Sequence, residues 1–318
     1  MTVRVALLGR GMAGTIFHAP LLRALPEFEM AAIAGASDAA AAIASPAVDL
    51  VVIATPNLTH YPLAAAALEA GKHVVVDKPF AVTVGEAEAL IALAAAKRRL
   101  LTVFHNRRWD GDFLTVRSLV ESRRLGGIAL FEAHWDRFRP APKLGWREEP
   151  EPGAGLLWDL GPHLVDQALL LFGIPDSVSG DVAIQREGAR VDDYFEVRMR
   201  YGAMRAVVSA SSLVASPRPR FAVHGTGGSF VKYGLDPQEA ALKQGVSPLA
   251  PGFGEDDPGR HGRFGDGREL ESVPTRRGRY LAFYEGVAAA IRDGAPPPVD
   301  PCDALEGLRI LAAVHAGA

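Results

Sequence analysis

The stretch Val3-Arg4-Val5-Ala6-Leu7-Leu8, followed at once by Gly9-Arg10-Gly11-Met12-Ala13-Gly14, decides the fold of this chain. The six residues of the first part are predicted to form a buried β-strand, and a helix is predicted from the glycines to about Leu25. In this spacing the first glycine permits a tight turn, the second lets the backbone approach a pyrophosphate, and the third allows close helix–strand packing. Residues 9–14 are therefore predicted to bind a dinucleotide at the helix N-terminus, the alternative being a purely structural glycine turn.

Strand-like and helix-like segments alternate up to about residue 105. Further strands are predicted at residues 30–34, 49–54, 73–76 and 100–104, and helices at residues 60–71 and 83–99. Strands separated by helices imply right-handed crossovers and a parallel sheet. One crossover, between Asp38 and Asp49, has room for barely two helical turns, and the sequence leaves open whether a short helix or a loop fills it.

The pattern changes after residue 105. Phe195, Val197, Met199 and Tyr201 alternate with charged residues, which is the period of a half-buried antiparallel strand. Similar strands are predicted at residues 206–213, 221–225 and 229–233, helices at 113–123 and 158–172, and a long exposed loop at 251–278. We therefore expect an α/β protein with a Rossmann domain at residues 1–105 and an α+β domain at residues 106–318. The second domain is expected to bind substrate, to dimerise and to contain a large, mostly antiparallel open sheet.

Composition narrows the class of function. The chain has 318 residues and a formal net charge of -3, so no strong basic balance points to nucleic acid or an anionic membrane. The single cysteine, Cys302, excludes an internal disulfide framework and a Cys-rich metal site, and it fits a reducing compartment. The apolar run Val5–Leu8 is too short for a signal peptide or a membrane span. We expect a cytoplasmic protein with neither nucleic acid nor membrane as a partner.

The residues after the second predicted strand bear on the choice of cofactor. An Asp or Glu about 20 residues past the glycines normally binds the ribose 2′-hydroxyl of NAD. Asp38, at the end of Gly35-Ala36-Ser37-Asp38, is one candidate, but it lies one position late and is equally placed to be a helix N-cap. Ser37 together with Arg10 is instead suited to the 2′-phosphate of NADP. The sequence slightly favours NADP over NAD.

Two other segments end predicted strands at the edge where such sheets bind their ligands. Thr55-Pro56-Asn57, with His60, is predicted to contact the nicotinamide or its ribose, and the alternative is turn chemistry with an N-cap for the next helix. His105-Asn106-Arg107-Arg108-Trp109 follows the fifth strand. Asn106 is a candidate contact to the cofactor and Arg107 a candidate contact to substrate hydroxyls, although an arginine near a domain junction is often structural.

Three residues are the candidates for chemistry. Lys78, in Asp77-Lys78-Pro79 after the fourth strand, is placed to hydrogen-bond a substrate hydroxyl, and a surface lysine in a turn is the alternative. A cis Lys–Pro bond is compatible with this tripeptide. Asp159 and His163 stand at i and i+4 on one face of a predicted helix, where a histidine can take the hydroxyl proton and a carboxylate can orient it. The alternative is a helix cap and a core histidine, and no metal is expected because no third ligand stands out.

With these elements in one order, the chain resembles the Gfo/Idh/MocA oxidoreductases, which include glucose–fructose oxidoreductase and inositol dehydrogenase. The resemblance rests on residues 9–14, Thr55-Pro56-Asn57-x-x-His60, residues 77–79, Phe104–Asp110 and Asp159–Asp166. It is greatest to the NADP-dependent scyllo-inositol dehydrogenase-like branch, through Phe17–Leu21, Asp136–Pro140 and Val231–Pro237. Asp77 replaces the commoner Glu of the family.

The resemblance implies a Rossmann domain and an open sheet whose exposed face often forms a dimer, so a homodimer or a dimer of dimers is expected. It implies that Lys78 touches the reacting hydroxyl, that His163 accepts the proton, and that Asp159 and Asp136 contact the substrate. The predicted function is NAD(P)-dependent hydride transfer with a secondary alcohol of a polyol or sugar. Two alternatives stay open: an NAD-dependent glycoside hydrolase of the same architecture, and a non-catalytic dinucleotide sensor.

Overall fold

The chain is divided into two compact units in a computed structural model that describes residues 2–142, 145 and 148–317. Unit 1 consists of Met1–Trp109, Gln238–Phe253 and Arg279–Leu308, and unit 2 consists of Asp110–Pro237, Gly254–Gly278 and Arg309–Ala318. The division after Trp109 lies close to the boundary expected after residue 105. Two later segments, Gln238–Phe253 and Arg279–Leu308, also belong to unit 1. A single boundary after residue 105 therefore does not describe the division of the chain.

Unit 1 is built on a five-stranded parallel sheet in the order β2-β1-β3-β4-β5, as the alternating strands and helices predict. The order reverses at β1, and open α/β sheets bind ligands at the carboxyl ends of the strands at such a reversal. Its elements are β1 (Val3–Leu8), the π-helix η1 (Ala13–His18), α1 (Ala19–Arg23), β2 (Phe28–Ala34), α2 (Ala39–Ala44), β3 (Leu50–Ile53), η2 (Asn57–Thr59), α3 (His60–Glu69), β4 (His73–Val76), α4 (Val84–Lys97), β5 (Leu101–Val103), η3 (Asn106–Trp109), α7 (Gln238–Lys243) and α8 (Leu281–Asp293).

Local sequence explains these elements. Every residue of β3 is buried, as expected for a strand that is covered on both faces of a parallel sheet. The predicted capping box is present at α4: the Thr83 side chain accepts from the Glu86 amide, and the Glu86 carboxylate accepts from the Thr83 amide. The short crossover after Asp38 contains the six-residue helix α2, so a short helix fills it.

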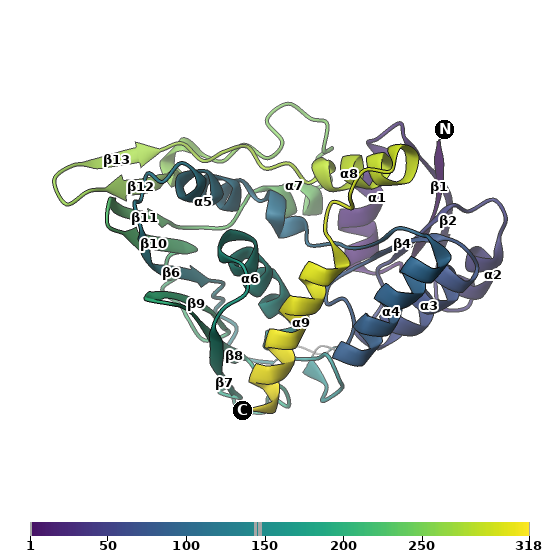
Figure 1. The fold of residues 1–318 in the computed structure, drawn as a ribbon, viewed down its shortest axis with the longest axis horizontal. Helices are drawn as coiled ribbons and strands as arrows, with labels where there is room; N and C mark the ends of the chain where they lie inside the picture. Colours follow the sequence, from purple (N-terminus) through teal and green to yellow (C-terminus); the bar gives the residue numbers. More distant parts are fainter. Residues whose placement is uncertain (1, 143–144, 146–147, 318) are drawn as a thin grey trace. The chain divides into compact units, whose positions relative to one another are not determined.

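Unit 2 contains an eight-stranded sheet in the order β13-β12-β11-β10-β6-β9-β8-β7 (Figure 1). It is mostly antiparallel, as expected, but β6 and β9 pair in parallel. Helix α9 (Pro301–Ala316) begins in unit 1 and ends in unit 2. The other elements are α5 (Gly111–Glu121), β6 (Ile128–His134), α6 (Leu156–Phe172), β7 (Ser177–Ala183), β8 (Tyr194–Tyr201), β9 (Met204–Ser211), β10 (Phe221–Gly225), β11 (Gly228–Lys232), η5 (Pro258–Arg260), β12 (Gly262–Gly265) and β13 (Leu270–Val273).

A single apolar core fills the space between this sheet and its helices. The alternating residues Phe195, Val197 and Met199 of β8 are fully buried, and they pack in one cluster with Leu164 of α6 and Leu311 of α9. Burial of this many large side chains is the main driving force for the fold of unit 2. The period-2 pattern of the sequence thus identified the inward face of β8 correctly.

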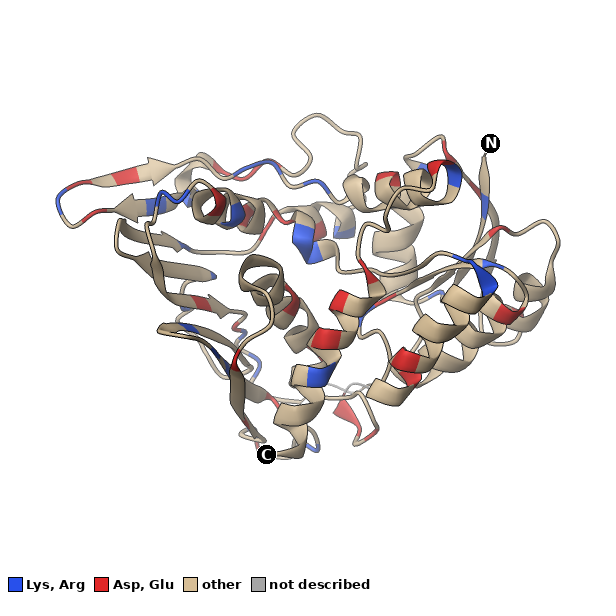
Figure 2. Ribbon diagram, in the orientation of Figure 1, with Lys and Arg blue, Asp and Glu red and all other residues tan. Residues whose placement is uncertain are grey.

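Charged residues of both signs are interspersed along the ribbon (Figure 2). No helix within the described residues is both long and apolar enough to cross a membrane.

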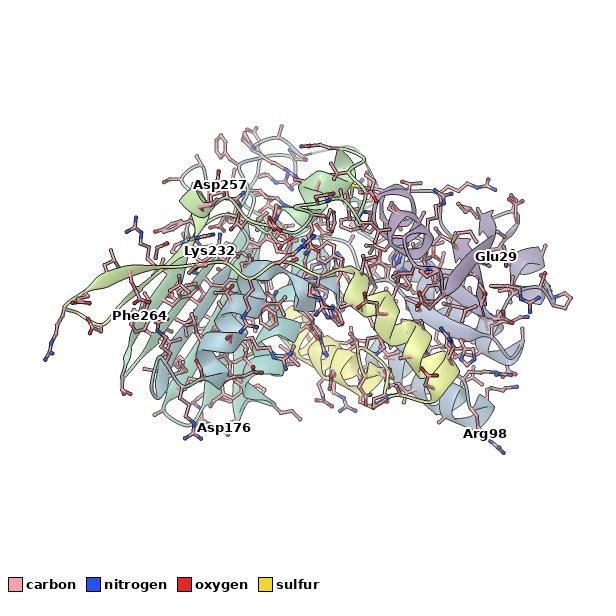
Figure 3. All side chains as sticks on the ribbon, turned by 90° about the horizontal axis from the view of Figure 1, so that it is seen from above. Glu29, Arg98, Asp176, Lys232, Asp257 and Phe264 are labelled. Carbon is pink, nitrogen blue, oxygen red and sulfur yellow. The ribbon has the colours of Figure 1, made fainter. Side chains whose placement is uncertain are left out.

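The prediction of a long exposed loop at residues 251–278 is wrong in part. Residues 262–265 and 270–273 form an antiparallel pair, β12 and β13, that extends the sheet beyond β11. The preceding segment is anchored by Asp256, which pairs with the Lys232 ammonium at 2.9 Å while both side chains are 1% exposed (Figure 3 labels Lys232). The sequence pattern does not predict this strand pair, because a segment rich in Gly, Asp and Arg is typical of a loop.

We expect Lys232→Met to lower the free energy of unfolding by about 3 kcal/mol, because it leaves the Asp256 carboxylate buried without its main counter-charge. The nearest remaining cation is Arg260, at 3.6 Å. Urea denaturation followed by circular dichroism measures the change.

The double variant Lys232→Met/Asp256→Leu is expected to recover most of this loss, since no buried charge remains. Arg117→Met is the matched control, because Arg117 pairs with Glu121 on the exposed face of α5 and exposed pairs contribute little. A Lys232→Met variant as stable as Arg117→Met would contradict the prediction.

Candidate active site

The glycine turn of unit 1, Gly9–Gly14, leaves room for a ligand next to its backbone. Gly9 has a φ of 120°, and a Cβ atom there would lie 2.2 Å from the Ala54 carbonyl oxygen. A Cβ on Gly14 would lie 2.1 Å from the Gly9 carbonyl oxygen, whereas a Cβ on Gly11 would meet nothing within 4 Å. The first and third glycines therefore serve close backbone packing, and the second leaves open space at the helix start. This fits a dinucleotide pyrophosphate held by Gly9–Gly14.

The residues that bear on cofactor choice form one exposed cluster. An Arg10 guanidinium nitrogen lies 2.7 Å from Oδ2 of Asp38, and the Ser37 hydroxyl donates to Oδ1 at 2.8 Å. The Ser37 hydrogen bond and the charge of Arg10 lower the pKa of Asp38, so the carboxylate is ionised. Asp38 occupies the N-cap position of α2 without a side-chain capping bond. The carboxylate thus engages both of the donors that the sequence predicts for a 2′-phosphate.

The buried His60 side chain contacts the two segments that follow strands β3 and β4. Its Nδ1 lies 2.8 Å from the Pro79 carbonyl oxygen and its Nε2 lies 3.0 Å from the Thr55 carbonyl oxygen. Burial lowers the pKa of His60, against the charge of Asp77 and the contacts of the ring with the two carbonyl oxygens. With both ring nitrogens facing the backbone, His60 positions the Thr55 turn and the segment after β4. Contact of His60 with the cofactor stays a prediction. The same holds for Thr55, Pro56 and Asn57.

Lys78 follows β4 at the carboxyl edge of the parallel sheet. The Asp77 amide donates to the Ile53 carbonyl at 2.8 Å, which continues the parallel pairing, and the Lys78 amide donates to Oδ1 of Asp77 at 2.7 Å. The Lys78–Pro79 bond is cis, and the Lys78 residue is partly exposed. The amides of Asp77 and Lys78 are both hydrogen-bonded, and these bonds fix the backbone that leads into Lys78.

Arg107 and Asn106 are both buried on η3. The Arg107 guanidinium donates to the Tyr280 hydroxyl at 2.5 Å and forms an ion pair with Glu239 of α7. Burial raises the pKa of Glu239, but the charges of Arg107 and Lys243 outweigh it and hold that pKa at about 2. Arg107 thus anchors two distant segments of unit 1, as the structural alternative for this residue requires. Substrate binding by Arg107 stays a prediction.

In unit 2, the start of helix α6 is fixed by a residue that the sequence did not single out. The Asp192 carboxylate accepts from the Leu157 amide at 2.6 Å, and the Asp192 carbonyl accepts from the Leu156 amide at 2.9 Å. Gly155, with a φ of 91°, allows this approach, because a Cβ there would lie 2.0 Å from a carboxylate oxygen of Asp192. Burial raises the pKa of Asp192 to about 6. Asp192 thereby supplies the N-terminal acceptor that α6 lacks.

Asp159 and His163 lie one turn apart on α6, as the i, i+4 spacing predicts. Oδ2 of Asp159 is 3.4 Å from a guanidinium nitrogen of Arg137, and both side chains are partly exposed. The His163 ring is 5% exposed and stacks on Trp135, with the ring centroids 5.9 Å apart. The helix, Arg137 and Trp135 hold these two side chains in defined positions. Neither Arg137 nor Trp135 was identified from the sequence, because their roles depend on packing against α6.

The Asp136 carboxylate is buried and forms an ion pair with Arg218. Both oxygens accept from Arg218 at 2.7 Å, and the side chain is 2% exposed. Substrate binding by Asp136 stays a prediction. Within the described residues, no group of three or more His, Cys, Asp or Glu side chains is placed to hold a metal ion.

Two family models match the chain. Residues 35–105 match the oxidoreductase-family NAD-binding Rossmann fold, and residues 117–317 match the oxidoreductase-family C-terminal alpha/beta domain, both of the Gfo/Idh/MocA group. The chain belongs to the Gfo/Idh/MocA oxidoreductase family. It is therefore an oxidoreductase with an NAD(P)-binding Rossmann fold, and the resemblance seen in the sequence is confirmed.

Several relatives match this Gfo/Idh/MocA oxidoreductase over nearly their full length. The uncharacterized oxidoreductase YdgJ of Escherichia coli is 43% identical over 97% of this chain and 94% of that protein. The scyllo-inositol 2-dehydrogenase (NADP(+)) IolW of Bacillus subtilis is 38% identical over 98% of this chain and 92% of that protein. The solved structure of the putative oxidoreductase yvaA from Bacillus subtilis superposes with a TM-score of 0.96 and 36% identity, over 99% of this chain and 95% of that one.

We expect Asp38→Asn to strengthen NADP binding by this oxidoreductase about fivefold relative to NAD. The substitution removes a negative charge close to Arg10 and Ser37 and releases both for a 2′-phosphate. Isothermal titration calorimetry with each cofactor measures the ratio of the two dissociation constants.

Arg10→Gln is the matched opposite change, and it is expected to weaken NADP binding while leaving NAD binding within about twofold. If Asp38→Asn leaves the NADP/NAD ratio unchanged, the cluster does not contact the adenosine ribose.

Proposed function

We propose that this oxidoreductase is an NAD(P)-dependent dehydrogenase that acts on a secondary alcohol of a polyol or sugar, of the inositol type. The observation that carries the proposal is the pairing of Asp159 and His163 on one face of α6, with the helix start anchored by Asp192. A histidine next to a carboxylate at this spacing suits proton transfer to and from a hydroxyl group. The substrate class follows the name of IolW, the scyllo-inositol dehydrogenase with 38% identity.

The roles of the residues follow from their chemistry. When bound, the nicotinamide supplies the acceptor or donor of the hydride. His163 takes the hydroxyl proton as the alcohol is oxidised and returns it to the carbonyl oxygen on reduction. The Lys78 ammonium donates a hydrogen bond to the same substrate oxygen, and the Asp159 carboxylate accepts from a substrate hydroxyl. The protein thus orients the alcohol and moves its proton.

NADP is the cofactor that we propose, with NAD as the alternative. Arg10 and Ser37 supply a cation and a hydroxyl donor beside the end of β2. These are the groups that suit a 2′-phosphate. The NADP named for IolW supports the same choice.

The proposal is tested by following NAD(P)H absorbance while the purified protein is offered each cofactor with a panel of inositols and aldoses. We expect turnover with at least one polyol. His163→Ala is expected to lower kcat/KM by about 10²- to 10⁴-fold, because general acid–base catalysis contributes that much. Lys78→Met is expected to lower kcat/KM as well, and the dissociation constant of the cofactor is expected to stay within about twofold in His163→Ala.

His224→Ala is the control, since this partly exposed histidine lies on β10, where its ring contacts Ser229 and Glu132. Cofactor binding without any turnover across the panel would contradict the polyol assignment. Undiminished turnover in His163→Ala would contradict the assigned proton acceptor. Release of sugar from a glycoside without net NAD(P)H would indicate the hydrolase alternative.

A further inference from the structure

A buried histidine lies behind the segment that carries Lys78. His18 ends the π-helix η1 that follows the glycine turn, and its side chain is fully buried. Its Nδ1 lies 2.6 Å from the Tyr284 hydroxyl of α8, and its Nε2 lies 3.8 Å from Oδ2 of Asp77. Single π-turns within helices often mark functional positions. A polar line thus runs from Tyr284 through His18 to Asp77, entirely within unit 1.

The surroundings of this line are apolar. The His18 ring packs on Phe104 with centroids 4.3 Å apart, and the Tyr284 ring packs edge-on against Phe283 and Phe28. Tyr284 is itself fully buried. Interactions between polar groups are stronger in such an environment than in water, so the orientation of each proton matters.

The proton positions follow from the groups present. Burial and the charge of Asp77 raise the pKa of Tyr284 well above its ordinary value, so its hydroxyl stays protonated. Among the described residues, Nδ1 is the one hydrogen-bond partner of this buried hydroxyl, so the tautomer in which Nδ1 accepts is favoured because it leaves no buried O–H unpaired. Nε2 then carries the proton and faces Oδ2 of Asp77 at 3.8 Å, which is too long for a direct hydrogen bond, so the N–H and the carboxylate attract each other electrostatically. The carboxylate favours the same tautomer only weakly, because its oxygen lies 3.8 Å from Nε2, beyond hydrogen-bond distance.

Asp77 links this line to Lys78. Its Oδ2 faces His18, while its Oδ1 accepts from the Lys78 amide at 2.7 Å. Burial raises the pKa of Asp77, but contact with His18 and the charges of Lys78 and His60 outweigh it and hold that pKa below its ordinary value. The ionisable groups that face the carboxylate are His18, Lys78, His60 and Tyr284. The carboxylate therefore stays ionised and keeps both contacts.

We propose that His18 and Tyr284 are positioning residues for Lys78. Tyr284 selects the His18 tautomer with the proton on Nε2, this N–H orients the Asp77 carboxylate, and Asp77 holds the Lys78 backbone amide. The direction of the Lys78 side chain is set in this way. The effect on catalysis rests on the proposed role of Lys78. The selection of the His18 tautomer by Tyr284 does not depend on that role.

The first test is nitrogen NMR of the protein with ¹⁵N-labelled histidine, in which the two ring tautomers have different shifts and couplings. His18→Gln identifies the signal. We expect the proton on Nε2 in the wild type and a mixture of tautomers in Tyr284→Phe. Thr102→Val is the matched control, because it also removes a fully buried hydroxyl of unit 1, one that donates to the Val299 carbonyl at 2.7 Å. A wild-type proton on Nδ1, or no change in Tyr284→Phe, would overturn the proposal.

The second test is kinetic. Tyr284→Phe is expected to lower kcat about tenfold and His18→Leu by up to about 100-fold, by analogy with the losses seen when the outer hydrogen-bond partner of a metal ligand is removed. The KM for the cofactor should not change. His18→Gln, whose amide N–H can face Asp77, should recover part of the rate lost in His18→Leu. Because the residues act in series, adding Tyr284→Phe to His18→Leu should lower kcat no further.

Two outcomes would contradict positioning. Additive losses in the double variant would show that the residues act independently, and a loss of kcat in Thr102→Val equal to that in Tyr284→Phe would show a general effect of stability. Failure of the proposed function is recognised separately. If Lys78→Met keeps full turnover, the role of Lys78 is wrong, while the NMR result still decides whether Tyr284 sets the tautomer of His18.

Discussion

The backbone contact between the glycine turn and the end of β3 is the constraint on which unit 1 depends. Gly9 approaches Ala54 so closely that no side chain fits, and Gly14 approaches Gly9 in the same way. This packing places the start of η1 at the carboxyl edge of the sheet, where the strand order reverses. The open space at Gly11, the cluster around Asp38 and the segment of Lys78 all lie at that edge, because parallel strands end together.

The candidate residues are held in position by buried polar contacts rather than by their own elements alone. His60 faces two backbone carbonyls, Arg107 binds Glu239 and Tyr280, and Asp192 holds the start of α6. Buried polar groups are costly unless they are paired, so each contact favours one arrangement of the segments that it joins. The candidate side chains of Lys78 and Asp159 can then remain partly exposed on a rigid support.

Most of the fold followed from local patterns. The period-2 alternation of β8, the buried run of β3 and the capping box at Thr83 are properties of short segments, and the structure confirms each. The segment 251–278 contains a strand pair that its composition does not predict, because Gly, Asp and Arg are typical of loops while the β12–β13 pair depends on the neighbouring strand β11. The return of residues 238–253 and 279–308 to unit 1 was also beyond local patterns, since it depends on distant contacts such as that of Arg107 with Glu239.

By itself the sequence determined the parallel and antiparallel sheets, the glycine turn and the order of motifs that identifies the Gfo/Idh/MocA family, because glycine spacing and apolar period act over a few residues. Only the tertiary structure decided which polar groups meet. Asp38 holds Arg10 and Ser37, and Tyr284 reaches His18 across 266 positions of the chain. The physical reason is that hydrogen bonds and ion pairs depend on distances of about 3 Å between side chains, and sequence separation does not encode such distances.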